Sequence, residues 1–319
     1  MSGLADERAW RGLDHLLSRL PAVWAWGCFE VRLAADDPQV DYSCCVCREG
    51  GGQDALAAAL RAGEEVLAGE LVRPVLEEWS RPGTLLAESV PVVWLEYDLP
   101  GGEVQAPCLF FTFMGLARRE AAPSPARLRS LAEAGLRLVP GRSGDGPRLA
   151  LLERCAAILP PGGRVYHVGT LPAWRGSQAL RLNAFLPSPA ALREWLSAAG
   201  WQVEPRSWNL ALELLGDEEE HCQIGLDLEG ELVRRLALET PRTTIGRQRL
   251  ERLVERGLAD RQKAEAVLGW SGSDRLWRGE AGFLLRVELE TSAIKIVVDA
   301  AGRAHAKAYL AFRPRYALF

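Results

Sequence analysis

The chain has 319 residues, of which 48% are hydrophobic and 25% are charged, so it can bury a large core. Its formal net charge of -4 and isoelectric point near 5.8 give no overall basic field, which argues against nucleic acid as a partner. The length would allow two ordinary domains, but closed barrels of this size often form one, and we expect a single domain over residues 1–319.

The N-terminal segment predicts an amphipathic helix. Four leucines recur there at helical spacing with charged residues between them: Leu13, Leu16, Leu17 and Leu20. A signal peptide would need a continuous apolar stretch, and no run of 18 apolar residues that could span a membrane occurs in the sequence. We therefore expect a soluble, cytoplasmic protein with no membrane partner.

Pairs of strand-like runs then alternate with helix-like stretches along the chain. The strand-like runs alternate apolar and polar residues, their turns carry Gly or Pro, and the helix-like stretches have apolar stripes. The predicted strand pairs are 28–33 with 42–47, 92–99 with 107–113, 164–171 with 179–186, 223–228 with 232–240, and 293–299 with 304–312, and an extra run covers 283–290. The predicted helices are 53–79, 124–135, 148–158, 188–199, 208–215, 244–256 and 260–269.

These five hairpins predict an α+β fold. Strands joined by short turns are antiparallel, so about ten strands in succession would make either an open sheet or a closed antiparallel barrel. Closure would remove the exposed strand edges, and helices outside the barrel would cover its apolar face.

The strands have one apolar and one polar face, because residues two apart share a face. If the apolar faces pack on helices, the polar faces look into one space lined by carboxylates, cations and aromatic rings. The polar faces could also simply meet water, as in any one-sided sheet, and a wide solvated barrel would satisfy both interpretations.

Other motifs give no site. Seven cysteines include the cluster Cys44, Cys45 and Cys47, but no second cysteine or histidine cluster follows as a zinc site would need, so we interpret them as buried strand residues of a reduced protein. The sequence has no Gly-rich phosphate loop of the P-loop or dinucleotide type and no HExxH motif.

Four segments carry a resemblance to a known family. They are GCFEVRL, which contains Glu30, VGTLPAWRGSQALRLNAFLPSPAALREWL, which contains Arg181, the hairpin IGLDLEGELVRRLALE, and AKAYLAF, which contains Lys307 and Tyr309. Together with the repeat of helices and hairpins, they resemble the ABBA prenyltransferases, and most of all the peptide prenyltransferases of cyanobactin pathways. The resemblance implies a closed barrel of ten antiparallel strands with helices outside, and it implies that Glu30 is the base.

The polar faces could support the chemistry that this resemblance implies. A prenyl diphosphate ionises to an allylic cation and diphosphate, so cations and hydroxyls must hold the leaving group, and aromatic faces must shield the cation. The candidate diphosphate ligands are Arg181, Arg235, Lys295, Lys307 and Tyr309. The candidates that line the substrate and shield the cation are Trp94, His167, Asn183 and Phe185.

A carboxylate must accept the proton that the acceptor loses, and Glu30, with Glu96 as the alternative, can take it. Mg²⁺ could accompany the diphosphate, but the sequence has no acidic metal motif of the terpene-synthase type, and we expect no protein metal site.

We therefore interpret the chain as a prenyltransferase that moves a short isoprenyl group, dimethylallyl by expectation, to a side chain of a peptide during natural-product biosynthesis. The alternatives are transfer to a small aromatic acceptor and a barrel without catalytic activity that binds peptide or an apolar ligand. An unrelated helix–hairpin repeat protein is a further alternative.

Overall fold

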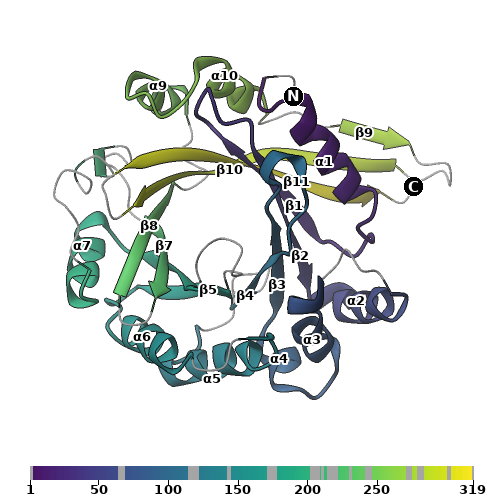
Figure 1. Ribbon diagram of the computed structural model, residues 1–319, viewed down its shortest axis with the longest axis vertical. Coiled ribbons are helices and arrows are strands. Elements are labelled where there is room, and N and C mark those ends of the chain that lie inside the picture. Colours follow the sequence, from purple (N-terminus) through teal and green to yellow (C-terminus); the bar gives the residue numbers. More distant parts are fainter. Residues whose placement is uncertain are drawn as a thin grey trace.

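Ten antiparallel strands form a closed ring in the computed structural model (Figure 1). The structure describes residues 3–63, 69–113, 122–141, 145–170, 178–201, 209, 212–213, 222–229, 232–240, 246–270, 275–278, 284–299 and 303–317. The strands are β1 (Trp26–Arg32), β2 (Val40–Cys47), β3 (Val92–Tyr97), β4 (Cys108–Thr112), β5 (Arg164–Thr170), β6 (Leu180–Leu186), β7 (Cys222–Glu229), β8 (Leu232–Thr240), β9 (Arg275–Arg278), β10 (Leu284–Asp299) and β11 (Ala304–Ala317).

The order of the strands shows how the ring closes. They follow one another as β11-β1-β2-β3-β4-β5-β6-β7-β8-β10-β9, and an additional pairing of β10 with β11 joins the two sides of the sheet. Of the strands in the described part of the chain, β9 alone lies outside the ring, and it pairs with the N-terminal end of β10. The predicted closed antiparallel barrel of about ten strands is therefore confirmed.

Helices cover the outside of the ring (Figure 1). They are α1 (Glu7–Leu17), α2 (Gly52–Arg61), α3 (Gly69–Ser80), α4 (Leu85–Ser89), α5 (Pro125–Leu136), α6 (Gly146–Ala157), α7 (Pro189–Ala198), α9 (Arg247–Glu255) and α10 (Arg261–Trp270). Local sequence fixes where several of them begin. Ser188 accepts a hydrogen bond from the backbone nitrogen of Ala191 (3.1 Å) and Pro189 occupies the first turn of α7, and Ser124 and Pro125 play the same parts at α5.

The hydrophobic core lies between the outer face of the barrel and these helices. Val31 of β1, Leu182 of β6 and Ile296 of β10 are completely buried there, in one cluster with helix residues such as Trp79 and Trp195. Because side-chain direction alternates along a strand, packing one face on the helices turns the other face of every strand toward the barrel interior. We call the residues that point to the interior the inner face.

The structure corrects some predicted boundaries. The runs 283–290 and 293–299 were expected to be separate, but β10 is one strand of 16 residues from Leu284 to Asp299. A shift in register between Thr291 and Ala293 breaks the alternation that the sequence pattern relies on. The short helix α4 and the strand β9 were not predicted, and the expected helix 208–215 lies mostly outside the described residues.

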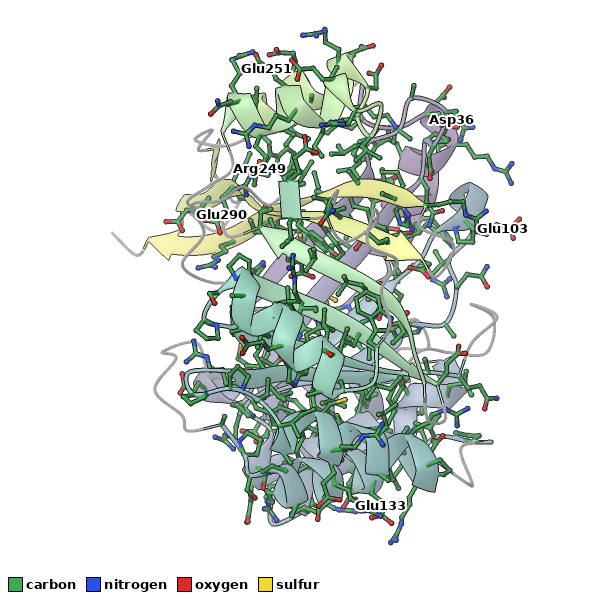
Figure 2. All side chains as sticks on the ribbon, turned by 90° about the vertical axis from the view of Figure 1, so that its left-hand side faces the viewer. Asp36, Glu103, Glu133, Arg249, Glu251 and Glu290 are labelled. Carbon is green, nitrogen blue, oxygen red and sulfur yellow. The ribbon has the colours of Figure 1, made fainter. Side chains whose placement is uncertain are left out.

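Many charged side chains lie on the outer surface of the molecule (Figure 2). Figure 2 shows Glu103, Glu133 and Glu251 projecting outward from loops and helices. Among the described residues, no helix is long and apolar enough to cross a bilayer.

Candidate active site

The inner face of the barrel is polar and partly exposed. Trp94, Glu96, His167 and Phe185 are half-buried, whereas their outward-pointing neighbours, such as Leu95, are almost completely buried. Since the outward side of each strand is sealed by helices, this exposure lies on the side of the interior. The predicted assignment of the two strand faces is therefore confirmed for these strands.

Glu30 is the centre of the charged part of the inner face. It is only 2% exposed, and both of its carboxylate oxygens have a partner on β11. Oε1 accepts a hydrogen bond from the ammonium group of Lys307, and Oε2 accepts one from the hydroxyl of Tyr309. The guanidinium of Arg32 lies 3.9 Å from Oε1. Burial alone would raise the pKa of Glu30, but the charges of Lys307, Lys295 and Arg32 outweigh it and hold this pKa well below its usual value. Glu30 is therefore ionised in the free protein.

A second buried carboxylate, Asp41, lies opposite Glu30 on β2. Its oxygens accept hydrogen bonds from Arg32 (3.0 Å), from the side chain of Gln39 (2.6 Å) and from the backbone nitrogen of Leu99 (3.0 Å). Burial, and then the negative charge of Glu30, raise the pKa of Asp41 above its usual value. Arg32 is thus shared between two carboxylates and fixed beside Glu30.

Lys295 of β10 completes this cluster. It lies opposite Lys307 in register, its ammonium group is 2.8 Å from Oε1 of Glu239, and it sits 4.7 Å from the centre of the Tyr309 ring. Burial would lower the pKa of Lys295, but Glu239 and Glu30 outweigh it and raise this pKa above its usual value. Its ammonium group therefore stays charged against the face of an aromatic ring.

Arg181 of β6 is held by a neighbour on β7. Its Nε and Nη2 atoms donate to the two carboxylate oxygens of Asp227, at 2.7 and 3.1 Å, in a buried bidentate pair. Arg235 of β8 lies opposite Asp227 in register, and its side chain falls outside the described part of the chain.

Aromatic rings gather on a second part of the inner face, formed by β1 and β3–β6. The rings of Trp26 and Trp94 meet edge to face at 5.2 Å, and Phe110 and Trp94 form a small inner cluster with Cys108. Tyr166 lies 4.3 Å from Phe185 and 4.4 Å from His167, measured between ring centres. The inner face therefore has a charged part and an aromatic part.

A β-bulge brings two consecutive residues to this aromatic part. Between Val165 and His167 the register with β6 shifts by one residue, so that Tyr166 is the extra residue and has no direct partner on β6. The hydroxyl of Tyr166 donates to Oε2 of Glu239 (3.4 Å), which links the aromatic part to the Lys295 cluster. Burial, and then the positive charge of Lys295, lower the pKa of His167 to about 3, so this imidazole is neutral near pH 7.

The structure brings together four of the residues predicted from sequence: Glu30, Lys295, Lys307 and Tyr309. Glu96 and Asn183 also lie on the inner face, where Glu96 pairs in register with Ser43 and Cys108 and Asn183 with His167 and Gly225. Sequence reasoning missed five partners, Arg32, Asp41, Tyr166, Asp227 and Glu239. Four of them could have been recognised because they alternate with apolar residues along their strands. Tyr166 could not, because it lies at the bulge.

The inner-face cations with described pairs are balanced by carboxylates. Arg32, Arg181, Lys295 and Lys307 contact Asp41, Asp227, Glu239 and Glu30, respectively. The described cations of the expected basic patch, Arg181, Lys295 and Lys307, are therefore all in ion pairs. Among the described residues, no group of three or more His, Cys, Asp or Glu side chains is arranged to hold a metal ion, and all seven cysteines are buried thiols.

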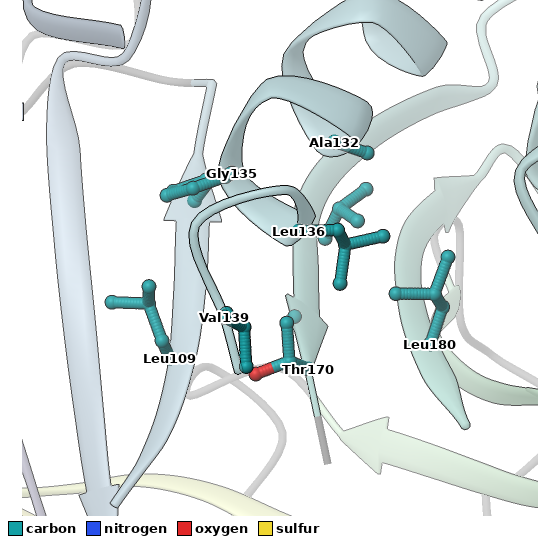
Figure 3. Close-up of a pocket in the computed structure, with 10 residues that line it drawn as sticks. Leu109, Ala132, Gly135, Leu136, Val139, Thr170 and Leu180 are labelled. Carbon is teal, nitrogen blue, oxygen red and sulfur yellow. The ribbon is translucent and has the colours of Figure 1, made fainter. Parts of the chain in front are cut away.

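An apolar pocket on the opposite side of the sheet is too small for a substrate. Figure 3 shows it between α5 and the outer faces of β4–β6, with Leu136, Val139 and Thr170 among its lining residues. Its volume is about 10 Å³, roughly the space of one water molecule. It is a packing gap, and the inner face remains the candidate site.

Comparison with solved structures identifies this architecture. The chain superposes on prenyltransferase PriB with a TM-score of 0.58 and 13% identity, over 98% of this chain and 92% of that one. It superposes on a 5-dimethylallyltryptophan synthase from Streptomyces coelicolor with a TM-score of 0.55 and 14% identity, over 97% of this chain and 92% of that one. The fold is that of the ABBA prenyltransferases.

The ABBA fold also appears in a 6-dimethylallyltryptophan synthase from Micromonospora olivasterospora solved in complex with DMASPP and Trp, with a TM-score of 0.55, 14% identity and coverage of 95% of this chain and 94% of that one. The sequence matches no model of a known protein family and no curated protein. The particular likeness to the cyanobactin-type enzymes stays a prediction.

Proposed function

We propose that the protein transfers a dimethylallyl group from its diphosphate to a side chain of a peptide. The observation that carries the proposal is the cluster in which Glu30 contacts Lys307 and Tyr309, with Lys295 beside them, on the inner face of an ABBA barrel. It combines a carboxylate for the acceptor with cations and a hydroxyl for the diphosphate.

The proposed reaction begins at the diphosphate. The bond between C1 of the prenyl group and the bridging oxygen breaks, and its electron pair leaves with the diphosphate, whose charge Lys295, Lys307, Arg181 and the Tyr309 hydroxyl stabilise. Trp94 and Phe185 face the allylic cation and keep water from it. The acceptor forms a bond to C1, and its displaced proton moves to a carboxylate oxygen of Glu30.

Glu30 and the diphosphate compete for the same hydrogen-bond donors, Lys307 and Tyr309. In the free protein, Lys307 and Tyr309 hold the two oxygens of Glu30 and keep it weakly basic. A diphosphate carries more charge than one carboxylate, so it draws these donors to itself. Binding of the prenyl diphosphate then leaves Glu30 with fewer hydrogen-bond partners and makes it the stronger base that the acceptor requires.

The charge balance of the inner face favours Mg²⁺ bound with the donor. Because the four cations of these ion pairs already have carboxylate partners, an incoming diphosphate gains little net attraction from them until some of its own charge is neutralised. The described residues offer no protein cage for the ion, so diphosphate oxygens would hold it.

The same charge balance favours a second candidate, a barrel without catalytic activity that binds peptide or an apolar ligand. Single-turnover assays separate the candidates, with labelled dimethylallyl diphosphate, with and without Mg²⁺, and a panel of peptides and small aromatic compounds. Transfer to peptides supports the proposal, and transfer to small aromatics alone supports an aromatic acceptor instead. Peptide binding without any transfer supports the second candidate.

A further inference from the structure

Three uncharged polar residues form a row across the inner face. Thr112 of β4 lies opposite His167 of β5, and His167 lies opposite Asn183 of β6. The next residue of the row, on β7, is Gly225. Neighbouring strands are about 4.8 Å apart, so the ends of the Thr112–His167–Asn183 row are separated by roughly 10 Å.

Two polar atoms of this row lack a partner. Thr112 is 5% exposed and Asn183 is 8% exposed, yet neither the hydroxyl oxygen of Thr112 nor the side-chain oxygen of Asn183 has a hydrogen bond. Buried polar groups are almost always paired, because leaving one unpaired forfeits its interaction with water. Two such atoms on the same face of β4 and β6, with His167 of β5 between them, indicate a place where a ligand supplies the missing partners.

The surroundings of the row suit a flat, neutral group. Trp94, Phe110 and Tyr166 place their rings within 6.4 Å of the His167 ring. The lack of a side chain at Gly225 leaves room at Asn183, since a Cβ atom there would lie 2.8 Å from the Asn183 oxygen. The imidazole of His167 is neutral near pH 7, so none of the three residues of the row carries a charge.

We propose that Thr112, His167 and Asn183 form a subsite that binds an amide group of the acceptor. An amide carries one donor and one acceptor in a plane, so it pairs with the carboxamide of Asn183 in either orientation of that group. A free carboxylate or ammonium group would meet no opposite charge in the row and would lose its hydration. The subsite therefore selects a peptide or another amide over a zwitterionic amino acid.

This inference rests on the proposed function, because that function is what makes the bound amide part of an acceptor. Its test is a binding measurement that does not depend on prenyl transfer. The probes are N-acetyl-tryptophanamide and free tryptophan, which share the indole ring and differ in the charged groups, titrated calorimetrically into the full-length protein. We expect the amide to bind at least about tenfold more tightly than the amino acid, because one well-made hydrogen bond corresponds to about that factor. Equal binding, tighter binding of free tryptophan, or no binding of either probe would overturn the subsite.

Two substitutions remove the unpaired polar groups and keep side chains of similar shape. Thr112→Val and Asn183→Leu should each weaken binding of the amide about tenfold and leave binding of inorganic pyrophosphate unchanged. Thr170→Val, on the outer face of β5, and Gln223→Met, an inner-face amide outside the row, are the matched controls and should leave amide binding unchanged. If Thr112→Val and Asn183→Leu bind the amide as the wild type does, the subsite is wrong.

A third variant covers the case in which Asn183→Leu fails to fold. Gly225→Ala places its Cβ against the Asn183 oxygen and should displace that group, with the same loss of amide binding. Unchanged amide binding in Gly225→Ala would count against the subsite. The proposed function fails separately, if the wild type binds neither pyrophosphate nor dimethylallyl diphosphate while its preference for the amide persists.

Discussion

Glu30 and Lys307 make a direct ion pair between β1 and β11, where the first and last strands of the chain meet and help to close the barrel. They are diagonal neighbours, since Glu30 lies opposite Tyr309 and Lys307 lies opposite Arg32. One carboxylate thus holds two groups that the proposed reaction needs for diphosphate. Under the proposed function, this pair links barrel closure to binding of the prenyl diphosphate and to the base strength of Glu30.

Replacing Glu30 by Gln should have opposite effects on catalysis and on diphosphate binding. Transfer should slow by about 10²–10⁴-fold, the usual contribution of a general base. Pyrophosphate should bind about tenfold more tightly, because Lys307 and Tyr309 lose a charged competitor. Single-turnover assays and calorimetry measure the two effects. Glu96→Gln is the control, and if it slows transfer while Glu30→Gln does not, Glu96 is the base.

Replacing Lys307 by Met should destabilise the protein strongly. It leaves Glu30 buried without its closest cation, and breaking a buried pair in this way costs about 3–5 kcal/mol. The double variant Glu30→Gln with Lys307→Met should recover much of that loss, because no buried charge is left unpaired. Urea unfolding of the four proteins gives the coupling energy.

The exposed pair Arg247–Glu265 provides the comparison for that cycle. Its atoms approach to 2.5 Å, but both side chains are more than half exposed and screened by solvent, so Arg247→Met should leave the free energy of unfolding nearly unchanged. If Lys307→Met is equally mild, or if the two single changes simply add, the ion pair does not stabilise the barrel as argued.

Replacing Lys263 by Met tests how the end of β1 is fixed. This buried lysine of α10 donates hydrogen bonds to the backbone oxygens of Arg32 (3.0 Å), Ala34 (2.7 Å) and Asp37 (2.6 Å). Without its ammonium group the three oxygens lose a donor, and the free energy of unfolding should fall by about 3 kcal/mol. The exposed neighbour Arg261→Met should have no such effect, and matching urea midpoints for the two variants would contradict the role given to Lys263.

The strand alternation in the sequence predicts which residues face inward, but not how they pair. Glu30, Lys295, Lys307 and Tyr309 were placed on the inner face by a period of two, which is a local property of any strand. Pairing depends on which strands are neighbours and in what register, so the contact of β11 with β1, about 280 positions apart, could not be read from a local pattern. Lys295 and Lys307 therefore looked free, although each has a carboxylate beside it.

The bulge shows a second limit of pattern reading. His167 was assigned to the inner face correctly, but strict alternation places Tyr166 on the outer face, and the register shift turns it inward. The bulge at Thr291 and Ala293 similarly made one long strand look like two runs. Such shifts depend on the partner strand, so a single strand sequence does not reveal them.

His167 should make the stability of the protein depend on pH between 7 and 5. Its pKa is lowered from 6.5 to about 3 in the folded protein, so the unfolded chain takes up this proton first as the pH falls. Native stability therefore decreases below pH 6.5, and the loss that His167 causes between pH 7 and pH 5 is about 2 kcal/mol. Glu30 adds nothing in this window, because its folded-state pKa is depressed and its stabilisation is lost only below the usual value of 4.5.

The variant His167→Asn removes this titration and keeps a neutral polar group in the row. Lys295 contributes to the shift from β10, paired with Glu239 of β8, and both remain in the variant, as does the neighbouring Tyr166. Urea unfolding of both proteins at pH 7 and pH 5 gives two differences in the free energy of unfolding. We expect the wild type to lose about 2 kcal/mol more than the variant over this interval, since other titrating groups are common to both. Equal losses would mean that His167 is charged in the folded protein near pH 5, and its place as a neutral member of the row would be wrong.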